Sequence, residues 1–495
     1  MRKFSILLCF VVGITTNHLT LGEIHADADF LSLTKQPYFV DTSVLIHKIF
    51  QYLACHKCQV NTNPHGFSKS INIDMIKRFA QIEVDQNGDT IPWNQTSQYD
   101  LFVNKLTVKA FYNDTLKHHL AYYPVIHIEL KNVVGSTMAE LISNLSQRIK
   151  KAYQEYEWLY KIYSKKFATT AGIKNEKSQL DFMKKVFENK DLSADDLKQS
   201  VATLVDTLFD YFNLTVFILI DDYDTPWIDV VKDKNNNLDL NEVHNLMTGI
   251  FGKLLEPEVD KHIEYIWMAG TNSVPFPHNM NEHTRFRRFM DSFPFAHFHS
   301  FEPKEMDALV KKFKLDELQV HELSYHYGGY YYPHNWMHVH RPSYVVKYLT
   351  NQPIDKSETK WIEHGDLSPL SMFLKNKVIR DKLTEVIEKR KFSFNITRLI
   401  KLEHWQKLAD IIRGKGDPET FCPNIFFTIL FENGYLSYSE QNNDFNKEKL
   451  LADFEKYNPD DDSFRDYIKC HDYKVPNALI LNSLKAFLSS YKENL

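Results

Sequence analysis

The chain has 495 residues, of which 43% are hydrophobic, 25% are charged and 14% are aromatic. This length and apolar content suffice for two or three domains with buried cores, and the composition excludes a largely disordered chain. The net charge of -5 gives no electrostatic reason to expect nucleic acid as a partner.

The first residues predict a secretory signal peptide. Arg2 and Lys3 precede an apolar run, residues 4–14, that is too short to span a bilayer, and small polar residues follow it. We expect cleavage after Gly22 and no membrane span in the remaining chain. The C-terminal sequence KENL differs from the retrieval signal KDEL because Asn494 stands where an acid is expected. Secretion is therefore the predicted location, with the lumen of the endoplasmic reticulum as the alternative.

Asn-x-Ser/Thr tripeptides support the prediction of export, because they are the acceptor pattern for N-glycosylation. Five of them predict a glycoprotein. Their acceptor residues are Asn94, Asn113, Asn144, Asn213 and Asn395.

Four cysteines remain once the leader is removed: Cys55, Cys58, Cys422 and Cys470. An even number in an oxidising compartment predicts disulfide bonds, and three connectivities are open. The stretch CHKC is also the pattern of a redox pair or of half a zinc site, but no second CxxC completes a metal site. Structural bridges are the favoured interpretation.

After the leader, the sequence predicts alternating helices and strands. Residues 38–60 suggest an extended segment, an amphipathic helix and then a strand, and residues 71–80 suggest a helix with one apolar face. A second strand is predicted at 122–130. A long charged helix is predicted over 136–168, followed by a polar connection with short helices over 169–196.

Two later segments predict buried strands. In residues 214–226, five consecutive apolar residues run directly into two acids, and residues 264–272 form a similar run that ends in small polar residues. Continuous apolar runs are typical of parallel strands that are covered on both faces. We therefore expect a doubly wound α/β domain, followed after residue 303 by a mainly helical region with no further buried strand.

The stretch TNPHGFSKSIN, residues 62–72, has the context of a phosphate-binding loop because it lies between a predicted strand and a predicted helix. In such loops backbone N–H groups and the helix N-terminus hold phosphate oxygens, a lysine neutralises charge and a hydroxyl binds magnesium. Lys69 and Ser70 fit the last two roles, but Ser68 stands where a glycine is expected. If Ser68 adopts a positive φ, the steric cost is about 1–2 kcal/mol.

Asp221 and Asp222 follow the clearest buried strand, where parallel sheets bind ligands. Asp221 is placed to hold magnesium through water, and Asp222 to orient an attacking water. The alternative is a solvated strand end followed by a turn. The basic stretch at 285–288 is either a phosphate contact or a surface patch.

Taken together, these segments resemble the AAA-ATPase-like proteins in order and spacing. That family is predicted to carry a P-loop ATPase domain, commonly followed by a PD-(D/E)XK-type nuclease domain. The resemblance runs from about Tyr38 to Leu349 and returns in two later stretches. The stretches that carry it are YFVDTSVLIHKIF, NPHGFSKSIN, YYPVIHIEL, FILIDDYDTP, FEPKEMDALV, YHYGGYYYP, RPSYVVKYL, FFTILFENGYLSY and YKVPNALILNSLKAFL.

The resemblance implies a P-loop NTPase-like parallel sheet with Mg and ATP as ligands. By this match, Lys69 and Ser70 are the phosphate-loop lysine and hydroxyl, and Asp221 is the magnesium-associated acid. Asp222 stands where the family has Glu. Phe67 and Ser68 complete the implied nucleotide-binding residues, and Asp224 and Pro226 complete the acidic signature.

The chain also departs from the family pattern. The family loop typically reads Arg-Pro-Arg-Arg-Phe-Gly-Lys-Thr, so three arginines that could hold polyphosphate are replaced here. The nuclease domain would usually begin near YKVPN, and we expect it to be absent. The predicted organisation is a signal peptide (1–22), an AAA-ATPase-like α/β domain (23–303), a helical lid-like subdomain (304–352) and a helical C-terminal region (353–495).

Two functional hypotheses follow. In the first, the chain is a secreted binding or effector protein with weak or lost nucleotide hydrolysis and an unidentified protein partner. In the second, it is an active Mg-dependent ATP hydrolase of the secretory lumen or extracellular space. The missing glycine and arginines favour the first hypothesis, whereas the Lys-Ser pair and the two acids support the second.

Overall fold

The computed structural model describes residues 29–52, 57–169, 174–188, 192–275, 284–288, 295–332, 337–350, 367–397, 399–440 and 472–493. The expected signal peptide, Cys55 and Cys470 lie outside these ranges. Within the described ranges, no helix combines the length and the apolar character needed to cross a membrane.

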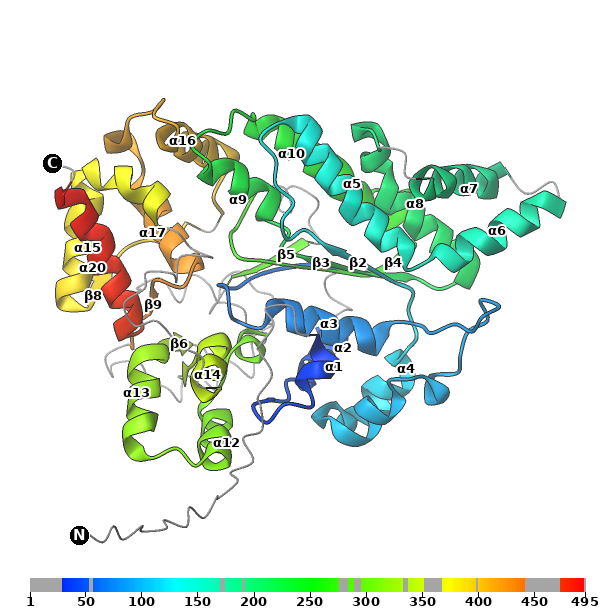
Figure 1. Cartoon of the computed structure of the whole chain (residues 1–495), viewed down its shortest axis with the longest axis horizontal. Helices are drawn as coiled ribbons and strands as arrows, with labels where there is room; N and C mark the ends of the chain where they lie inside the picture. The colour runs from blue at the N-terminus through cyan, green and yellow to red at the C-terminus, as the bar shows by residue number, and fades with distance from the viewer. Residues whose placement is uncertain are drawn as a thin grey trace, which may run out of the picture.

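A five-stranded, all-parallel sheet forms the centre of the molecule, in the order β2-β3-β4-β1-β5 (Figure 1). All six residues of β3 are buried, as the continuous apolar run predicts for a strand covered on both faces. The order places the carboxyl ends of β1, β4 and β3 side by side at one edge. The strands are β1 (Cys58–Thr62), β2 (Val125–Glu129), β3 (Val216–Asp221), β4 (Ile263–Gly270) and β5 (Thr284–Arg288).

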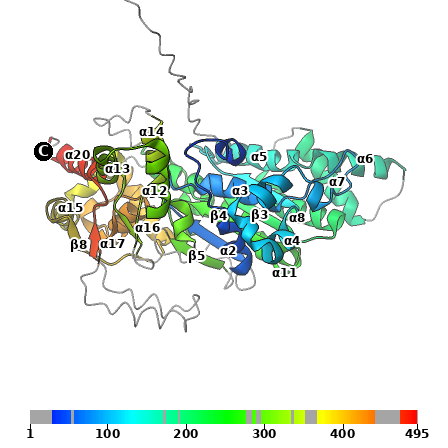
Figure 2. The ribbon, with the colours of Figure 1, turned by 90° about the horizontal axis from the view of Figure 1, so that it is seen from below.

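Helices cover both faces of this sheet, which confirms the α/β expectation (Figures 1 and 2). One face packs against α5 (Met138–Gln154), α8 (Ala194–Phe212), α9 (Thr225–Lys232) and α10 (Leu240–Phe251), with α6 (Glu157–Thr169) and α7 (Lys174–Phe187) outside them. The other face packs against α1 (Phe30–Leu33), α2 (Val44–Tyr52), α3 (Lys69–Ala80), the short turns η2 (Leu101–Lys105), η3 (Thr107–Phe111) and η4 (Tyr112–Leu116), and α4 (Lys117–His119). The connecting turns are η1 (Trp93–Gln95), η5 (Gly252–Leu255), α11 (Pro257–Asp260) and η7 (Ala296–His299).

The predicted long helix over 136–168 is two helices, α5 and α6, that meet at residues 155–156. The Tyr156 hydroxyl donates to the carbonyl of Val125 at 2.6 Å and accepts from its amide at 3.0 Å. These bonds tie the junction to the start of β2. The polar connection that we expected next contains the 14-residue helix α7, whose Met183 and Val186 are buried.

The chain after residue 303 forms a lid-like helical unit and a C-terminal region. The lid-like unit contains α12 (Pro303–Phe313), α13 (Glu317–Tyr327), β6 (Tyr330–Tyr332), β7 (Met337–Val339) and α14 (Pro342–Leu349). The C-terminal region contains η9 (Ser368–Lys375), α15 (Lys377–Lys389), β8 (Lys391–Ser393), α16 (Leu402–Ile412), η10 (Pro418–Thr420), α17 (Pro423–Glu432), β9 (Ser437–Tyr438), β10 (Asp472–Lys474) and α20 (Ala478–Glu493).

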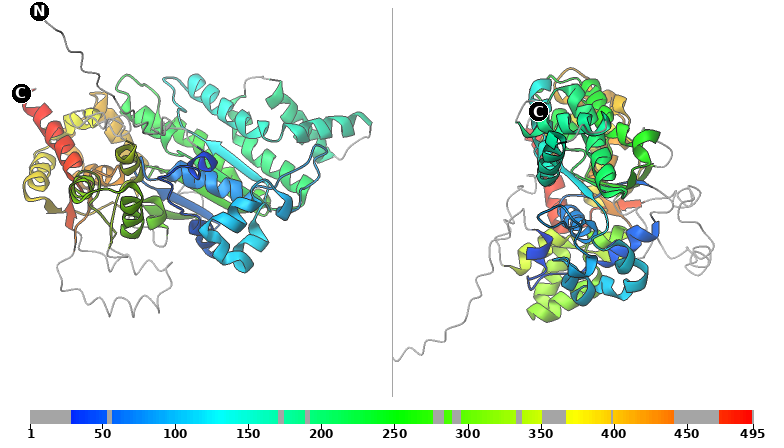
Figure 3. Two further views of the ribbon diagram at one scale, coloured as in Figure 1. Left: turned by 60° about the horizontal axis from the view of Figure 1, so that its bottom comes forward. Right: turned by 90° about the vertical axis from the view of Figure 1, so that its right-hand side faces the viewer.

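The last helix, α20, joins these two parts (Figure 3). It packs on α15 and η9, and its Leu479 enters the apolar cluster of the lid-like unit. The short strands β6 to β10 contradict the expectation of no buried strand after 303. They have only two or three residues each, too few to produce a recognisable alternation.

The basic stretch at 285–288 lies in the edge strand β5, and two of its arginines are buried instead of forming a surface patch. Arg287 and Arg288 are 7% and 6% exposed. Arg287 donates to the side chain of Gln59 on β1 at 2.8 Å, and Arg288 pairs with the buried carboxylate of Glu432 at 3.1 Å. Each guanidinium is thus held by the protein itself.

The prediction of structural disulfides is not supported for the two described cysteines. Cys58 and Cys422 are both free thiols, and Cys422 is exposed. Cys58 is the first residue of β1, where burial raises the pKa of its thiol to about 12. It therefore behaves as a small apolar core residue.

Glu305 in the first turn of α12 generates a prediction about stability. Its carboxylate accepts from the amide of Glu302 at 2.8 Å. Burial, followed by the nearby Glu302 and Asp41 carboxylates, raises the pKa of Glu305 to about 7. A raised carboxyl pKa means that the folded state holds the proton more tightly than the unfolded state, so stability falls as pH rises from about 4.5 to 7.

We therefore expect Glu305→Gln to stabilise the protein at pH 8, by roughly 1–2 kcal/mol because the group is partly hydrated, and to change little at pH 4.5. Thermal unfolding at the two pH values measures this. Glu317→Gln, an exposed acid in the first turn of α13, is the control and should have the same small effect at both pH values. An equal effect of Glu305→Gln at both would contradict the prediction.

Candidate nucleotide-binding site

The loop between β1 and α3 has the backbone strain that the missing glycine predicts. Ser68 has φ 50° and ψ 21°, in the left-handed region, and Gly66 has φ 76°. For a serine this conformation costs about 1–2 kcal/mol. The Ser68 side chain makes no capping hydrogen bond to α3. The helix N-terminus therefore keeps the amide groups and the partial positive charge that favour an anion.

Lys69 is the first residue of α3, and its ammonium group lies inside the loop. The side chain is 6% exposed, and Nζ donates to the carbonyls of Asn63 at 2.8 Å and Pro64 at 3.2 Å. A third bond, at 3.2 Å, reaches the Thr271 hydroxyl just beyond β4. Burial lowers the pKa of Lys69, whereas the Asp222, Asp221 and Asp224 carboxylates act in the opposite direction.

Asp221 ends β3 and lies close to Lys69 and Ser70. It is 2% exposed, and burial together with the Asp222 carboxylate raises its pKa to about 7. The nearby Ser70 hydroxyl and the Lys69 charge act against this rise. Lys69, Ser70 and Asp221, which the sequence predicts to act together, therefore lie near one another in the structure.

This donor set fits magnesium bound together with a phosphate. Magnesium in nucleotide sites takes one or two protein oxygens and keeps several water and phosphate oxygens. The Ser70 hydroxyl and the Asp221 carboxylate supply such oxygens near each other. Within the described ranges no three His, Cys, Asp or Glu side chains gather as a metal site.

Asp222 follows Asp221 and has φ 52°, so it is, after Ser68, the second non-glycine residue of this site in the left-handed region. Burial raises the pKa of its carboxyl group, and the Lys69 charge lowers it. It therefore lies within electrostatic range of the loop lysine, where a water-orienting acid would be needed. Its side chain is one methylene shorter than the Glu of the family pattern.

Asp224 has a structural role that the sequence did not reveal. Its carboxylate is buried and accepts three hydrogen bonds: from the Thr271 amide at 3.1 Å, the Asn272 amide at 2.8 Å and the Asn272 side-chain amide at 3.0 Å. It therefore fixes the segment after β4 against the end of β3. This contact and the Lys69–Thr271 hydrogen bond make Thr271 and Asn272 residues of the site. The one sequence signal was a strand that ends in small polar residues.

The lid-like unit covers the phosphate loop from outside. The Ser343 amide donates to the Gly66 carbonyl at 3.2 Å, and a Cβ at Gly66 would lie 2.1 Å from the Ser343 hydroxyl. The buried Arg341 guanidinium lies over the Phe67 ring at 5.7 Å. The Phe67 ring also packs edge-on against Tyr330 at 5.1 Å. The Phe67 side chain is completely buried, so the nucleotide binding that the resemblance implies for this residue would use its backbone.

A parallel α/β sheet with a Lys-Ser loop after its first strand and an acid at the end of its third strand defines the P-loop type of nucleotide-binding fold. A family model described as predicted AAA-ATPase matches residues 28–276, about half of the chain. The chain belongs to this family. A search of curated proteins finds no significant match.

The strain at Ser68 leads to a testable prediction. Ser68→Gly should raise the free energy of unfolding by about 0.5–1 kcal/mol, because the relief of left-handed strain exceeds the added chain entropy of glycine. Urea unfolding measures the change. The matched control is Ser143→Gly on the exposed face of α5, where glycine should instead cost about 0.5 kcal/mol. Destabilisation by both variants would contradict the assigned strain.

Proposed function

We propose that this protein is an exported glycoprotein that binds a Mg-nucleotide between the β1–α3 loop and the end of β3, and that it hydrolyses the nucleotide slowly or not at all. The proposal rests mainly on the meeting of Lys69, Ser70 and Asp221 at an uncapped helix N-terminus. In this proposal the chain acts as a binding or effector protein with an unidentified protein partner.

Three features support weak hydrolysis. The strained Ser68 puts a side chain where the family loop has only a backbone. The loop lacks the family arginines, which would stabilise charge on a transferred phosphoryl group. Asp222 is shorter than the usual Glu, so a water would have to lie closer to the strand end.

An active Mg-dependent ATPase is the second candidate, and one observation favours it. Arg341 brings a buried guanidinium close enough to lower the pKa of Lys69. This charge comes from the lid-like unit and could replace part of the cationic charge that the loop lost. Phosphate release that depends on Lys69, Asp221 and Asp222 would support this candidate.

The positions of four sequons are compatible with export. Asn94, Asn113, Asn213 and Asn395 are exposed. Asn144 differs, because it lies in α5 and its side-chain amide donates to the carbonyl of Val134 at 2.7 Å. We propose secretion as the destination, with the lumen of the endoplasmic reticulum as the alternative.

The central experiment is a calorimetric titration of the glycosylated protein with Mg-ATP and Mg-ADP. We expect Lys69→Ala to weaken binding by roughly 10- to 100-fold, because hydrogen bonds to charged groups contribute about 1.5–3 kcal/mol. Lys77→Ala is the matched control, since Lys77 lies on the same helix but pairs with Glu155 at 2.7 Å. No heat of binding by the unmodified protein, or equal binding by both variants, would refute the proposed site.

Glycan occupancy provides a separate prediction. After expression through a eukaryotic secretory pathway, Asn→Gln changes at Asn94, Asn113, Asn213 and Asn395 should each remove one glycan mass. Asn144→Gln should leave the mass unchanged, because the Asn144 amide lies on helix α5 and is held by the Val134 carbonyl. Mass spectrometry before and after enzymatic removal of N-glycans gives the answer. An entirely unglycosylated product would argue against export.

A further inference from the structure

The C-terminal end of α17 contacts the candidate site at Ser273, although its Glu432 lies 159 residues after Ser273 in the chain. We call residues Glu432–Gly434 the α17 turn. Glu432 is completely buried, and its carboxylate accepts from the Ser273 amide at 3.0 Å and the Ser273 hydroxyl at 2.6 Å. The Arg288 guanidinium balances its charge at 3.1 Å. The carboxylate therefore connects the segment after β4 with the edge strand β5.

The next residue, Asn433, contacts the segment that holds Lys69. Its side-chain amide donates to Asn272 Oδ1 at 2.8 Å and to the Ile429 carbonyl of its own helix at 2.9 Å. Asn272 is bound in turn to Asp224, which also binds the Thr271 amide. A continuous series of hydrogen bonds therefore joins the α17 turn to the hydroxyl that accepts from Lys69.

Gly434 contacts the phosphate loop from the other side. It has φ 79°, and a Cβ there would lie 3.0 Å from Cγ of Pro64. Its carbonyl accepts from the Tyr330 hydroxyl at 3.0 Å, and the Tyr330 ring packs on Phe67 of the loop. The α17 turn thus contacts both elements that surround Lys69.

Ligand binding must disturb either the β1–α3 loop or the segment after β4, because both accept hydrogen bonds from Lys69. An ammonium group has three donors, and Lys69 directs hydrogen bonds to Asn63, Pro64 and Thr271. A phosphate oxygen that pairs with Lys69 has to replace at least one of them. The two longer bonds, both 3.2 Å, go to Pro64 and Thr271, which are the residues that the α17 turn holds in place.

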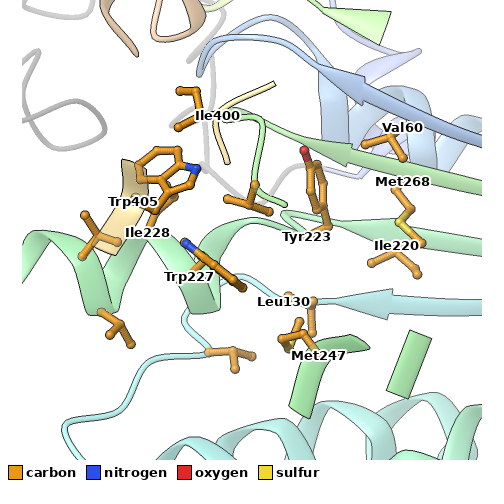
Figure 4. Packing of buried hydrophobic residues seen from close by; sticks show 14 of the residues in the cluster. Val60, Leu130, Ile220, Tyr223, Trp227, Ile228, Met247, Met268, Ile400 and Trp405 are labelled. Carbon is orange, nitrogen blue, oxygen red and sulfur yellow. The ribbon is translucent and has the colours of Figure 1, made fainter. Parts of the chain in front are cut away.

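There is space beside the turn for a small rearrangement. A cavity of about 40 Å³ lies next to the Asn272–Asn433 hydrogen bond. Its walls are mainly apolar and come from α9, α16, α17 and η9, including Trp405. Figure 4 shows Trp405 beside Ile228 of α9, and its indole N–H donates to the Ser273 carbonyl at 3.2 Å.

We propose that the α17 turn is a working part of the nucleotide site and that Asn433 is a positioning residue for Thr271 and Asn272. Nucleotide binding and the position of the C-terminal region are then coupled. If nucleotide changes the affinity of a partner that binds the C-terminal region, that partner changes the affinity for nucleotide by the same factor, because such coupling is reciprocal. This inference rests on the proposed nucleotide binding and adds its regulation.

The experiment compares Asn433→Ala with Asn424→Ala, a change of the same residue type in the first turn of the same helix. Calorimetric titration with Mg-ATP should give about 10-fold weaker binding for Asn433→Ala, within the usual range for coupled sites, and a change within about twofold for the control. Asn433→Asp, which keeps the shape but loses the donor, should behave like Asn433→Ala. Near-normal affinity of Asn433→Asp would overturn the inference.

Thermal unfolding of each ligand-free variant separates positioning from simple stability. A lower midpoint for Asn433→Ala with unchanged Mg-ATP affinity overturns the inference but leaves the proposed function intact. If the unmodified protein binds no Mg-ATP, the proposed function fails and the coupling to nucleotide fails with it. Amide hydrogen exchange at residues 63–70 and 271–275 then decides only whether Asn433 positions these two segments. Faster exchange in Asn433→Ala than in Asn424→Ala supports the positioning role, and equal exchange overturns it.

Discussion

The candidate site depends on one buried cation at the edge of the sheet. Burial of the Lys69 ammonium would be unfavourable by itself, and three bonds to two carbonyls and a hydroxyl make it possible. The Asp221, Asp222 and Asp224 carboxylates at the end of β3 balance its charge. Because those acids are themselves buried near one another, each side of the site needs the other. The loop, β3 and the segment after β4 are held together by this mutual dependence.

The same site contains several unfavourable local features. Ser68 and Asp222 both adopt left-handed backbone conformations without being glycine, and the pKa of Asp221 is shifted to about 7. Such strain persists only where the surrounding structure determines the conformation, and it concentrates at functional sites. Here the surroundings include α14 over Gly66 and the α17 turn against Pro64. The lid-like unit and the C-terminal region are therefore structural parts of the site.

Local sequence patterns were sufficient for much of the sheet. β3 and β4 appear as continuous apolar runs because both faces of a central strand are covered, and the acids after β3 mark its carboxyl end. β5 could not be recognised, since its sequence has the composition of an exposed patch, and Arg287 and Arg288 are buried only because Gln59 and Glu432 accept their hydrogen bonds. The break at Tyr156 depends in the same way on a hydrogen bond to β2, a contact between residues 31 positions apart.

The sequence by itself determined the parallel α/β core, the family, and the meeting of a Lys-Ser loop with an acidic strand end. These features follow from apolar periodicity and from residues adjacent in the chain, so short stretches carry them. The tertiary structure decided that Thr271 accepts a hydrogen bond from Lys69, that the Phe67 ring packs on Tyr330, and that Glu432 and Asn433 reach the site. Each of these contacts joins residues far apart in sequence, and a buried polar group finds its partner only when the packed chain brings the two together.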